Sequence, residues 1–256
     1  MARARRKKSG TDVYHIVSRG NNQKNILEED NDKKYFYSLM KEKAGQFQVE
    51  IYAYCIMSNH FHLMVKSDFK MLSVFMRELN SNYAVYYNCK YGESGHVFQG
   101  RFYSSCIEKE SYMVSCIRYI HNNPVRAYLV SDILSYPYSS AREIFLNDRR
   151  KKRGCISRDI FGILSNRFTS LDQFYDFHNV FDNQGYIDIP EDKERYDRER
   201  IKSFLDHYIR KNNIKNERII LSARHIREDL IQICEKNTGL SKRNIENILK
   251  TVVKGA

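Results

Sequence analysis

Two histidines, His60 and His62, flank a single phenylalanine in the segment YAYCIMSNHFHLMVK, which spans residues 52–66. The apolar, β-rich surroundings predict a strand. Side chains two positions apart on a strand point to the same face, so the two imidazoles are expected to stand side by side. Neighbouring imidazoles could hold one metal ion. An isolated His-x-His pair is more often an ordinary polar pair, so a metal site needs support from elsewhere in the chain.

A second candidate group lies on the helix predicted over residues 110–122, which runs into the segment YIHNNPVRA. Tyr119 and Asn123 are four residues apart, a spacing that stacks them on one helix face about 6 Å apart along the axis. A phenol and an amide oxygen could then face the same point. The commoner fates are a core aromatic for Tyr119 and, for Asn123, a helix end set by Pro124. His121 does not share the face of Tyr119.

The elements that must position these groups follow from the hydrophobic periodicity. The predicted order is a strand at 12–18, a helix at 31–44, strands at 48–56 and 61–66, a helix at 71–88, a hairpin or edge strand within 91–108, and the helix at 110–122. Gly45 is expected to end the first helix, and Pro124 to end or bend the last. This order is typical of an α+β fold of ferredoxin-like type, with one antiparallel sheet and helices on one face.

Composition and charge divide the chain into four parts. We expect a disordered basic arm at residues 1–9, an α+β domain at 10–146, a connector of uncertain structure at 147–197, and a helical region at 198–256. The connector opens with NDRRKKRG, and hydrophobic periodicity is weak up to its end.

The helical region contains two predicted helices around the turn Thr238-Gly239-Leu240-Ser241. A helix, a short glycine turn and a second basic helix give the outline of a helix-turn-helix, so we predict a DNA-binding domain. Lys242, Arg243 and Asn244 are then in the first turn of the second helix, where such side chains contact DNA. A plain three-helix capping bundle is the alternative.

The overall composition favours a nucleic-acid partner. The chain has 43 lysines and arginines against 31 acidic residues, for a net charge of +12, and it carries 19 tyrosines and 14 phenylalanines that bases can stack on. No apolar run approaches the roughly 20 residues of a membrane span, so no membrane partner is expected. The six cysteines form no C-x-x-C pair, which predicts reduced thiols in a cytoplasmic, nucleoid-associated protein.

Four segments together resemble a known family. They are YHIVSRG at 14–20, MSNHFHLMVK at 57–66, GHVFQGRF at 95–102 and YIHNNPVRA at 119–127. In order and spacing they resemble the single-tyrosine transposases of the HUH endonuclease superfamily, and most closely the REP-associated tyrosine transposases. The resemblance covers residues 10–142 and implies an enzyme, a metal-dependent single-strand DNA endonuclease and strand transferase that acts on hairpin-forming repeat DNA.

The resemblance also implies roles for single residues. His60, Phe61 and His62 match the family's metal-binding histidine pair and the bulky residue between them. Asn123 matches the polar residue that completes the metal site, and Tyr119 matches the nucleophile, which forms a 5′-phosphotyrosine. Mg²⁺ or Mn²⁺ is the expected ion, although histidine ligands by themselves would favour Mn²⁺ or Zn²⁺.

The sequence contains other candidate site residues and allows other functions. Arg101, Arg118 and Arg126 are expected to contact DNA phosphates, with solvated surface arginines as the alternative. His15, on the first strand, could lie near the site, although a histidine packed in the sheet is more common. A non-catalytic DNA-binding regulator of repeat sequences is the competing function. A metallohydrolase acting on a small molecule lacks the further carboxylate and histidine ligands that it needs. The sequence leaves open a homodimer.

Overall fold

The computed structural model describes residues 6–146, 154–180, 186, 190–214, 216–217 and 219–254. Residues 1–5 of the predicted arm and 147–153 of the predicted connector lie outside the described residues. The chain forms two compact units, residues 1–182 and 183–256.

Unit 1 is built on one antiparallel sheet with strand order β2-β3-β1-β4. The strands are β1 (Val13–Arg19), β2 (Glu50–Ile56), β3 (His60–Lys66) and β4 (Tyr103–Cys106). Helix α1 (Asp30–Gln46) joins β1 to β2, and helix α2 (Phe69–Tyr91) joins β3 to β4. This topology confirms the predicted α+β fold of ferredoxin-like type.

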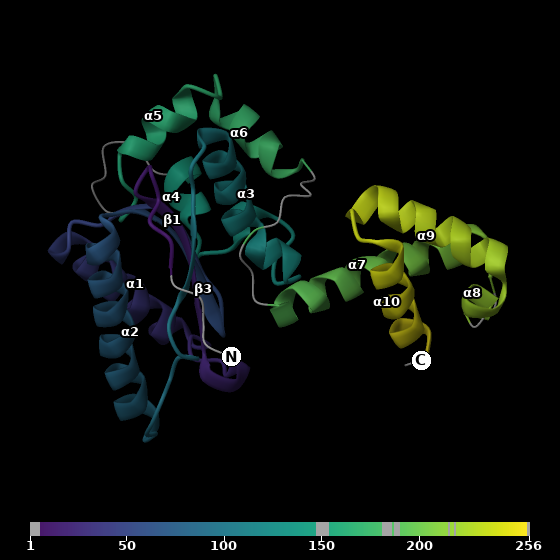
Figure 1. Ribbon diagram of the computed structural model, residues 1–256, viewed down its shortest axis with the longest axis horizontal. Helices are drawn as coiled ribbons and strands as arrows, with labels where there is room; N and C mark the ends of the chain where they lie inside the picture. Colours follow the sequence, from purple (N-terminus) through teal and green to yellow (C-terminus); the bar gives the residue numbers. More distant parts are fainter. Residues whose placement is uncertain are drawn as a thin grey trace. The chain divides into compact units, whose positions relative to one another are not determined.

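The two faces of the sheet follow from the alternation along each strand. On β1, Tyr14 and Ile16 belong to the hydrophobic core that α1 and α2 close, while His15 and Val17 must face the other way. Helix α3 (Glu110–Arg126) follows β4 and lies on that second face, so that α1 and α2 cover one side of the strands and α3 the other (Figure 1). The sheet therefore has a core face and a separate face available for a site.

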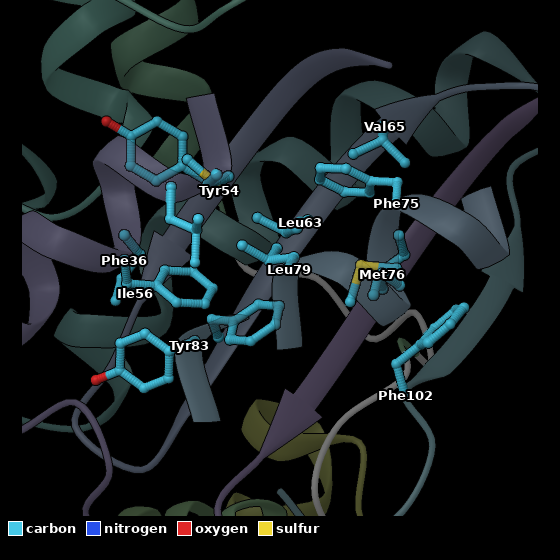
Figure 2. Packing of buried hydrophobic residues seen from close by; sticks show 14 of the residues in the cluster. Phe36, Tyr54, Ile56, Leu63, Val65, Phe75, Met76, Leu79, Tyr83 and Phe102 are labelled. Carbon is cyan, nitrogen blue, oxygen red and sulfur yellow. The ribbon is translucent and has the colours of Figure 1, made fainter. Parts of the chain in front are cut away.

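Large apolar side chains fill the core face (Figure 2). Phe36 of α1 and both Phe75 and Leu79 of α2 are fully buried in one cluster with Leu63 and Val65 of β3. Burying a side chain of this size contributes about 1.5–3 kcal/mol relative to leaving it exposed. This cluster holds β3 in place from behind and fixes which residues of β3 face α3.

Helix α3 is longer than predicted. It continues past residue 122 to Arg126, with Pro124 inside its last turn. Proline has a helix-compatible φ and removes only one backbone hydrogen bond there, and the N–H of Ala127 still donates to the carbonyl oxygen of Asn123 at 2.9 Å. Gly45 likewise lies within α1 rather than after it. The longer α3 keeps Asn123 and Arg126 on the same helix as Tyr119.

A glycine turn fixes the start of β3. The N–H of Gly20 donates to the carbonyl oxygen of Asn59 at 2.7 Å, and the N–H of Leu27 donates to that of Ser58 at 2.7 Å. A Cβ atom at Gly20 would lie 2.2 Å from the carbonyl oxygen of Lys24, so only glycine fits. The turn before His60 is thus held by backbone bonds from the end of β1.

Three short helices complete unit 1. They are α4 (Ser140–Leu146), α5 (Asp159–Ser165) and α6 (Leu171–His178). Helices α5 and α6 fall in the stretch where the sequence predicted no definite structure. Segments around α4 and α5 also cover the outer edge of β2, where Ile56 N–H donates to Tyr138 O at 2.9 Å and Ser157 N–H donates to Ile51 O at 2.7 Å.

Unit 2 is entirely helical where the structure describes it. Its helices are α7 (Pro190–Lys211), α8 (Ile219–Ser222), α9 (Arg224–Thr238) and α10 (Lys242–Lys254). Buried residues from α7, α9 and α10, among them Leu205, Leu230 and Leu249, form one core. Gly239 ends α9 in the left-handed conformation at φ 68°, which gives the helix-turn-helix outline that the sequence predicted. The first helix begins at Pro190 rather than at 198.

None of the helices in the described parts of the chain combines the length and the apolar character that crossing a membrane requires.

Candidate active site

The two histidines of the His-x-His pair stand together at the start of β3. Their ring centroids are 5.0 Å apart with an interplanar angle of 82°, and both side chains are buried. Since Phe61 between them belongs to the core behind the sheet, His60 and His62 point to the face that α3 covers. The strand alternation thus delivers both imidazoles to one place.

Tyr119 of α3 packs directly on this histidine face. Its ring centroid lies 5.6 Å from that of His62 and 5.8 Å from that of His15, both in edge-on geometry. The guanidinium carbon of Arg126 lies over the Tyr119 ring, 4.7 Å from its centroid. The structure therefore brings the predicted nucleophile, one predicted metal ligand and a positive charge into one group.

Asn123 is attached to the same helix turn. Its side chain is buried, and Nδ2 donates to the backbone carbonyl oxygen of Tyr119 at 3.0 Å. This hydrogen bond goes to the backbone of Tyr119 rather than to His60 or His62. It restrains the amide, whose oxygen is the atom that would bind a metal ion.

His15 joins the site from β1. Its Nε2 lies 3.1 Å from Nδ1 of His62, and the two rings stack with centroids 5.3 Å apart. Burial lowers the pKa of His15 to about 3. Burial, followed by the charges of His60, His15 and Arg126, holds the pKa of His62 well below its usual range. These lowered pKa values favour the neutral form of both rings, which is the form in which histidine binds metals.

The donor atoms of the two histidines fit a divalent ion. Nε2 of His62 is buried and makes no hydrogen bond to any residue that the structure describes, an arrangement that costs about 1–3 kcal/mol unless a ligand satisfies it. Nδ1 of His60 lies 2.7 Å from Oδ1 of Asn59. An amide oxygen only accepts, so His60 carries its proton on Nδ1 and offers the Nε2 lone pair.

Among the described residues, no further histidine, cysteine or carboxylate group completes the ligand set. Within the described ranges, no three or more of these side chains are grouped so as to hold a metal ion. A site built on His60 and His62 must therefore be completed by a different donor, such as the amide oxygen of Asn123, by substrate oxygens or by water.

The three arginines proposed as phosphate contacts are placed differently. Arg101 is exposed, and Arg126 is half-buried over Tyr119. Arg118 is only 6% exposed; its guanidinium lies 4.1 Å from the Phe177 ring centroid and donates to the Phe177 carbonyl oxygen at 3.3 Å. The prediction for Arg118 is corrected accordingly, because this side chain anchors α6 to α3 instead of facing DNA.

His121 is turned away from Tyr119 and forms a second histidine pair. Its Nδ1 lies 2.9 Å from Nε2 of His178 on α6, and its Nε2 lies 2.8 Å from Oγ of Ser140. Nδ1 of His178 donates to the carbonyl oxygen of Phe174 at 2.7 Å. Sequence periodicity did not reveal this pair, which joins α6 to α3, the helix that carries Tyr119.

In unit 2, the three predicted DNA-contact residues open α10. Lys242 pairs with Glu228 of α9 at 2.6 Å. Arg243 and Asn244 are exposed. The first turn of α10 thus presents one cation that is paired within the unit and two polar side chains directed to solvent.

The first part of the chain is similar to known proteins. Residues 11–123 match the model of the family described as IS200-like transposase. A protein of Haemophilus influenzae named as a REP-associated tyrosine transposase is 28% identical over 139 residues, which are 45% of this chain and 76% of the relative. Residues 11–123 include His15, His60 and His62, as well as Tyr119 and Asn123.

Two solved structures are similar. One is a REP-associated tyrosine transposase bound to a REP hairpin, with a TM-score of 0.48 and 19% identity, covering 56% of this chain and 84% of the other. The second is a transposase of Deinococcus radiodurans R1, with a TM-score of 0.34 and 16% identity, covering 48% of this chain and 97% of the other.

Proposed function

Since residues 11–123 match the IS200-like transposase family, as the sequence resemblance predicted, we propose that this protein is a metal-dependent endonuclease and strand transferase. Its proposed substrate is single-stranded DNA of hairpin-forming repeats. The observation that carries the proposal is the packing of the Tyr119 ring against His62 under the guanidinium of Arg126. A protein that only binds DNA has no need for this combination.

In the proposed reaction, Oη of Tyr119 attacks the scissile phosphorus. The bond from phosphorus to the 3′ oxygen of the leaving nucleotide breaks, and the phenol proton ends on that oxygen. The products are a 5′-phosphotyrosine and a free 3′-OH. Because the phosphotyrosine keeps the bond energy of the original ester, another 3′-OH can reverse the attack and rejoin the strand. The result is transfer rather than hydrolysis.

The chain's own residues prepare this attack. His60 and His62, through their Nε2 atoms, and Asn123 are the proposed ligands of Mg²⁺ or Mn²⁺. When bound, such an ion supplies positive charge to the non-bridging phosphate oxygens, where charge accumulates during the displacement. Arg126 holds a second positive charge beside the Tyr119 ring, which stabilises negative charge developing on the phenol oxygen. Exposed Arg101 is the proposed contact to a flanking phosphate.

The test is formation of a covalent protein-DNA adduct. The protein is incubated with labelled single-stranded hairpins and Mg²⁺ or Mn²⁺, and a denaturing gel is examined for a band of protein joined to DNA. Tyr119→Phe keeps the ring and its packing but removes the attacking oxygen, so the band should vanish at an unchanged melting temperature. Tyr112→Phe, on the same helix, is the matched control and should keep it. An adduct that survives in Tyr119→Phe sinks the assignment.

The metal ligands are tested with the same gel. His60→Ala or His62→Ala should abolish metal-dependent adduct formation. Asn123→Ala should weaken it less, since water can take one coordination position. Equal Mn²⁺ affinity in the wild type and the double histidine variant, measured by calorimetry, would contradict a shared site.

A second role, binding of duplex DNA, is favoured by the helix-turn-helix outline of unit 2. We propose that α10 enters the major groove, with exposed Arg243 and Asn244 contacting base edges. Arg243→Ala should lower duplex affinity and its salt dependence, while Lys250→Ala, exposed farther along α10, serves as a control. Unchanged duplex affinity in Arg243→Ala would refute the role of α10, and the absence of an adduct with every hairpin would refute the endonuclease role.

A further inference from the structure

We infer that His15 is a positioning residue, which sets the tautomer of His62 and so makes Nε2 its metal-binding atom. The inference deepens the proposed function, since it rests on His62 being a metal ligand. His15 itself contacts neither substrate nor ion in this scheme. It acts through one hydrogen bond to the ligand.

The geometry isolates this one bond. His62 Nδ1 and His15 Nε2 are 3.1 Å apart. In the β1–β3 register, His62 is opposite Val17 and His15 is opposite Met64, so the two histidines are diagonal neighbours on the same face. Both side chains are fully buried. With Nδ1 engaged by His15, Nε2 is the ring nitrogen of His62 left for a ligand.

Two proton arrangements are possible for a neutral pair. If His15 donates from Nε2, then His62 accepts at Nδ1 and carries its own proton on Nε2, where it cannot bind a metal ion. If His62 donates from Nδ1, its Nε2 carries a lone pair. Only the second arrangement produces a ligand, and it requires that His15 present an acceptor at Nε2.

An acceptor at Nε2 of His15 puts the proton of that ring on Nδ1. This nitrogen is buried without a hydrogen bond to the described residues. Ser105 of β4 is the cross-strand partner of His15, and its Oγ is likewise buried with no partner in the described structure. Paired Cβ atoms in a sheet lie about 4.5–5.5 Å apart, within reach of a bridging water. Ser105 is thus the cross-strand group that could accept the Nδ1 proton of His15 through such a water.

His60, the neighbouring proposed ligand, is oriented in the same way. Oδ1 of Asn59 lies 2.7 Å from Nδ1 of His60 and forces the proton onto that nitrogen. Each metal-binding histidine thus has its own orienting acceptor at Nδ1, an amide for His60 and an imidazole for His62. Partners of this kind commonly contribute 10–100-fold to metal affinity.

The experiment compares His15→Gln with His15→Leu in the full chain. Glutamine offers a carbonyl oxygen to Nδ1–H of His62, whereas leucine has a similar volume and no acceptor. We expect His15→Leu to weaken Mn²⁺ binding by about 10–100-fold in calorimetry, and His15→Gln to restore most of it. Equal Mn²⁺ affinity in the wild type and a folded His15→Leu overturns the inference.

A second readout needs neither metal nor DNA. ¹⁵N NMR of the histidine rings in the metal-free wild type should show His62 protonated at Nδ1 and bare at Nε2. A proton on Nε2 overturns the inference even if His15→Leu fails to fold. His178→Gln, in the other buried histidine pair, is the matched control and should leave Mn²⁺ affinity unchanged.

The two proposals fail in different ways. Loss of the covalent adduct in every hairpin assay would refute the proposed function while the tautomer of His62 stood as measured. An adduct together with an Nε2-protonated His62 would refute only the role of His15. Ser105→Ala should weaken Mn²⁺ binding less than His15→Leu, because it removes the outer acceptor and leaves the bond to His62 in place.

Discussion

Unit 1 contains two buried histidine pairs that share a geometry and differ in their surroundings. His15 and His62 stack at 21° with ring nitrogens 3.1 Å apart, and His121 and His178 stack at 12° with ring nitrogens 2.9 Å apart. We call the first the open pair and the second the closed pair. The open pair packs against Tyr119, and the closed pair joins α3 to α6.

The closed pair has a partner for every ring nitrogen. The carbonyl oxygen of Phe174 only accepts, so His178 carries its proton on Nδ1. Its Nε2 then accepts from Nδ1 of His121, and Nε2 of His121 accepts from the hydroxyl of Ser140. In the open pair, Nδ1 of His15 and Nε2 of His62 have no hydrogen-bond partner in the described residues.

The difference separates a structural contact from a binding site. A buried polar series that is complete stabilises and rigidifies the helices it joins, whereas an incomplete one costs free energy until a ligand completes it. The closed pair ties α6 to the helix that carries Tyr119. In the inferred tautomer, the open pair directs the Nε2 lone pair of His62 toward the proposed metal site.

The largest expected effect on stability comes from breaking the closed pair. His121→Leu removes two hydrogen bonds and leaves Nε2 of His178 buried without a donor, so we expect a loss of about 3–5 kcal/mol in the free energy of unfolding. Urea unfolding of the full chain measures it. A cost no greater than that of His15→Leu would mean that the two pairs do not differ in the way described.

A second effect of similar kind is a dependence of stability on pH. Burial lowers the pKa of His178 from 6.5 to about 4, so the folded state holds this ring neutral while the unfolded chain takes up a proton. The stability that the neutral His178 ring contributes is fully present above pH 6.5 and is lost as pH falls toward 4. The loss approaches about 3 kcal/mol at 1.36 kcal/mol per pKa unit. His178→Gln should remove this part of the slope in urea unfolding.

His15→Leu should cost much less stability than His121→Leu. It leaves Nδ1–H of His62 without an acceptor, but it also removes Nδ1 of His15, a buried nitrogen that has no partner among the described residues. These two effects largely offset each other, so the net loss is expected to be about 1 kcal/mol. The main effect of His15→Leu should instead be weaker binding of Mn²⁺. A loss of several kcal/mol in urea unfolding would show that His15 serves mainly to hold the sheet.

The smallest effect is expected from removing unit 2. A chain ended after residue 182 keeps both histidine pairs, so the unfolding of unit 1 and adduct formation on a short hairpin should stay as they are, while duplex affinity falls and its salt dependence flattens. A chain ended after residue 168 loses His178 and should be less stable. If the chain ended after residue 182 kept its duplex affinity but lost much of its melting temperature, unit 2 would have no DNA-binding role.

Local patterns predicted the parts of this molecule that local physics decides. Alternation placed His60 and His62 on one face, and the four-residue spacing kept Tyr119 and Asn123 on one helix. The closed pair joins residues 57 apart in sequence, through a short helix with weak periodicity, so nothing near His121 announced its partner. The sequence also failed to show that Arg118 is covered, because the covering residues belong to α6. The start of α7 is highly charged and lacks the apolar spacing that marks a helix.

The two edges of the sheet have a consequence for how copies of this protein meet. Exposed strand edges promote pairing between molecules. The outer edge of β2 is covered by backbone bonds, and β4 is only four residues long. The Arg6 guanidinium lies over the Phe102 ring, and the Cys106 thiol donates to the carbonyl oxygen of Lys7. Two basic residues therefore lie beside β4. A second copy arriving edge to edge would bring the same charges, and the repulsion, strongest at low salt, opposes aggregation by sheet extension.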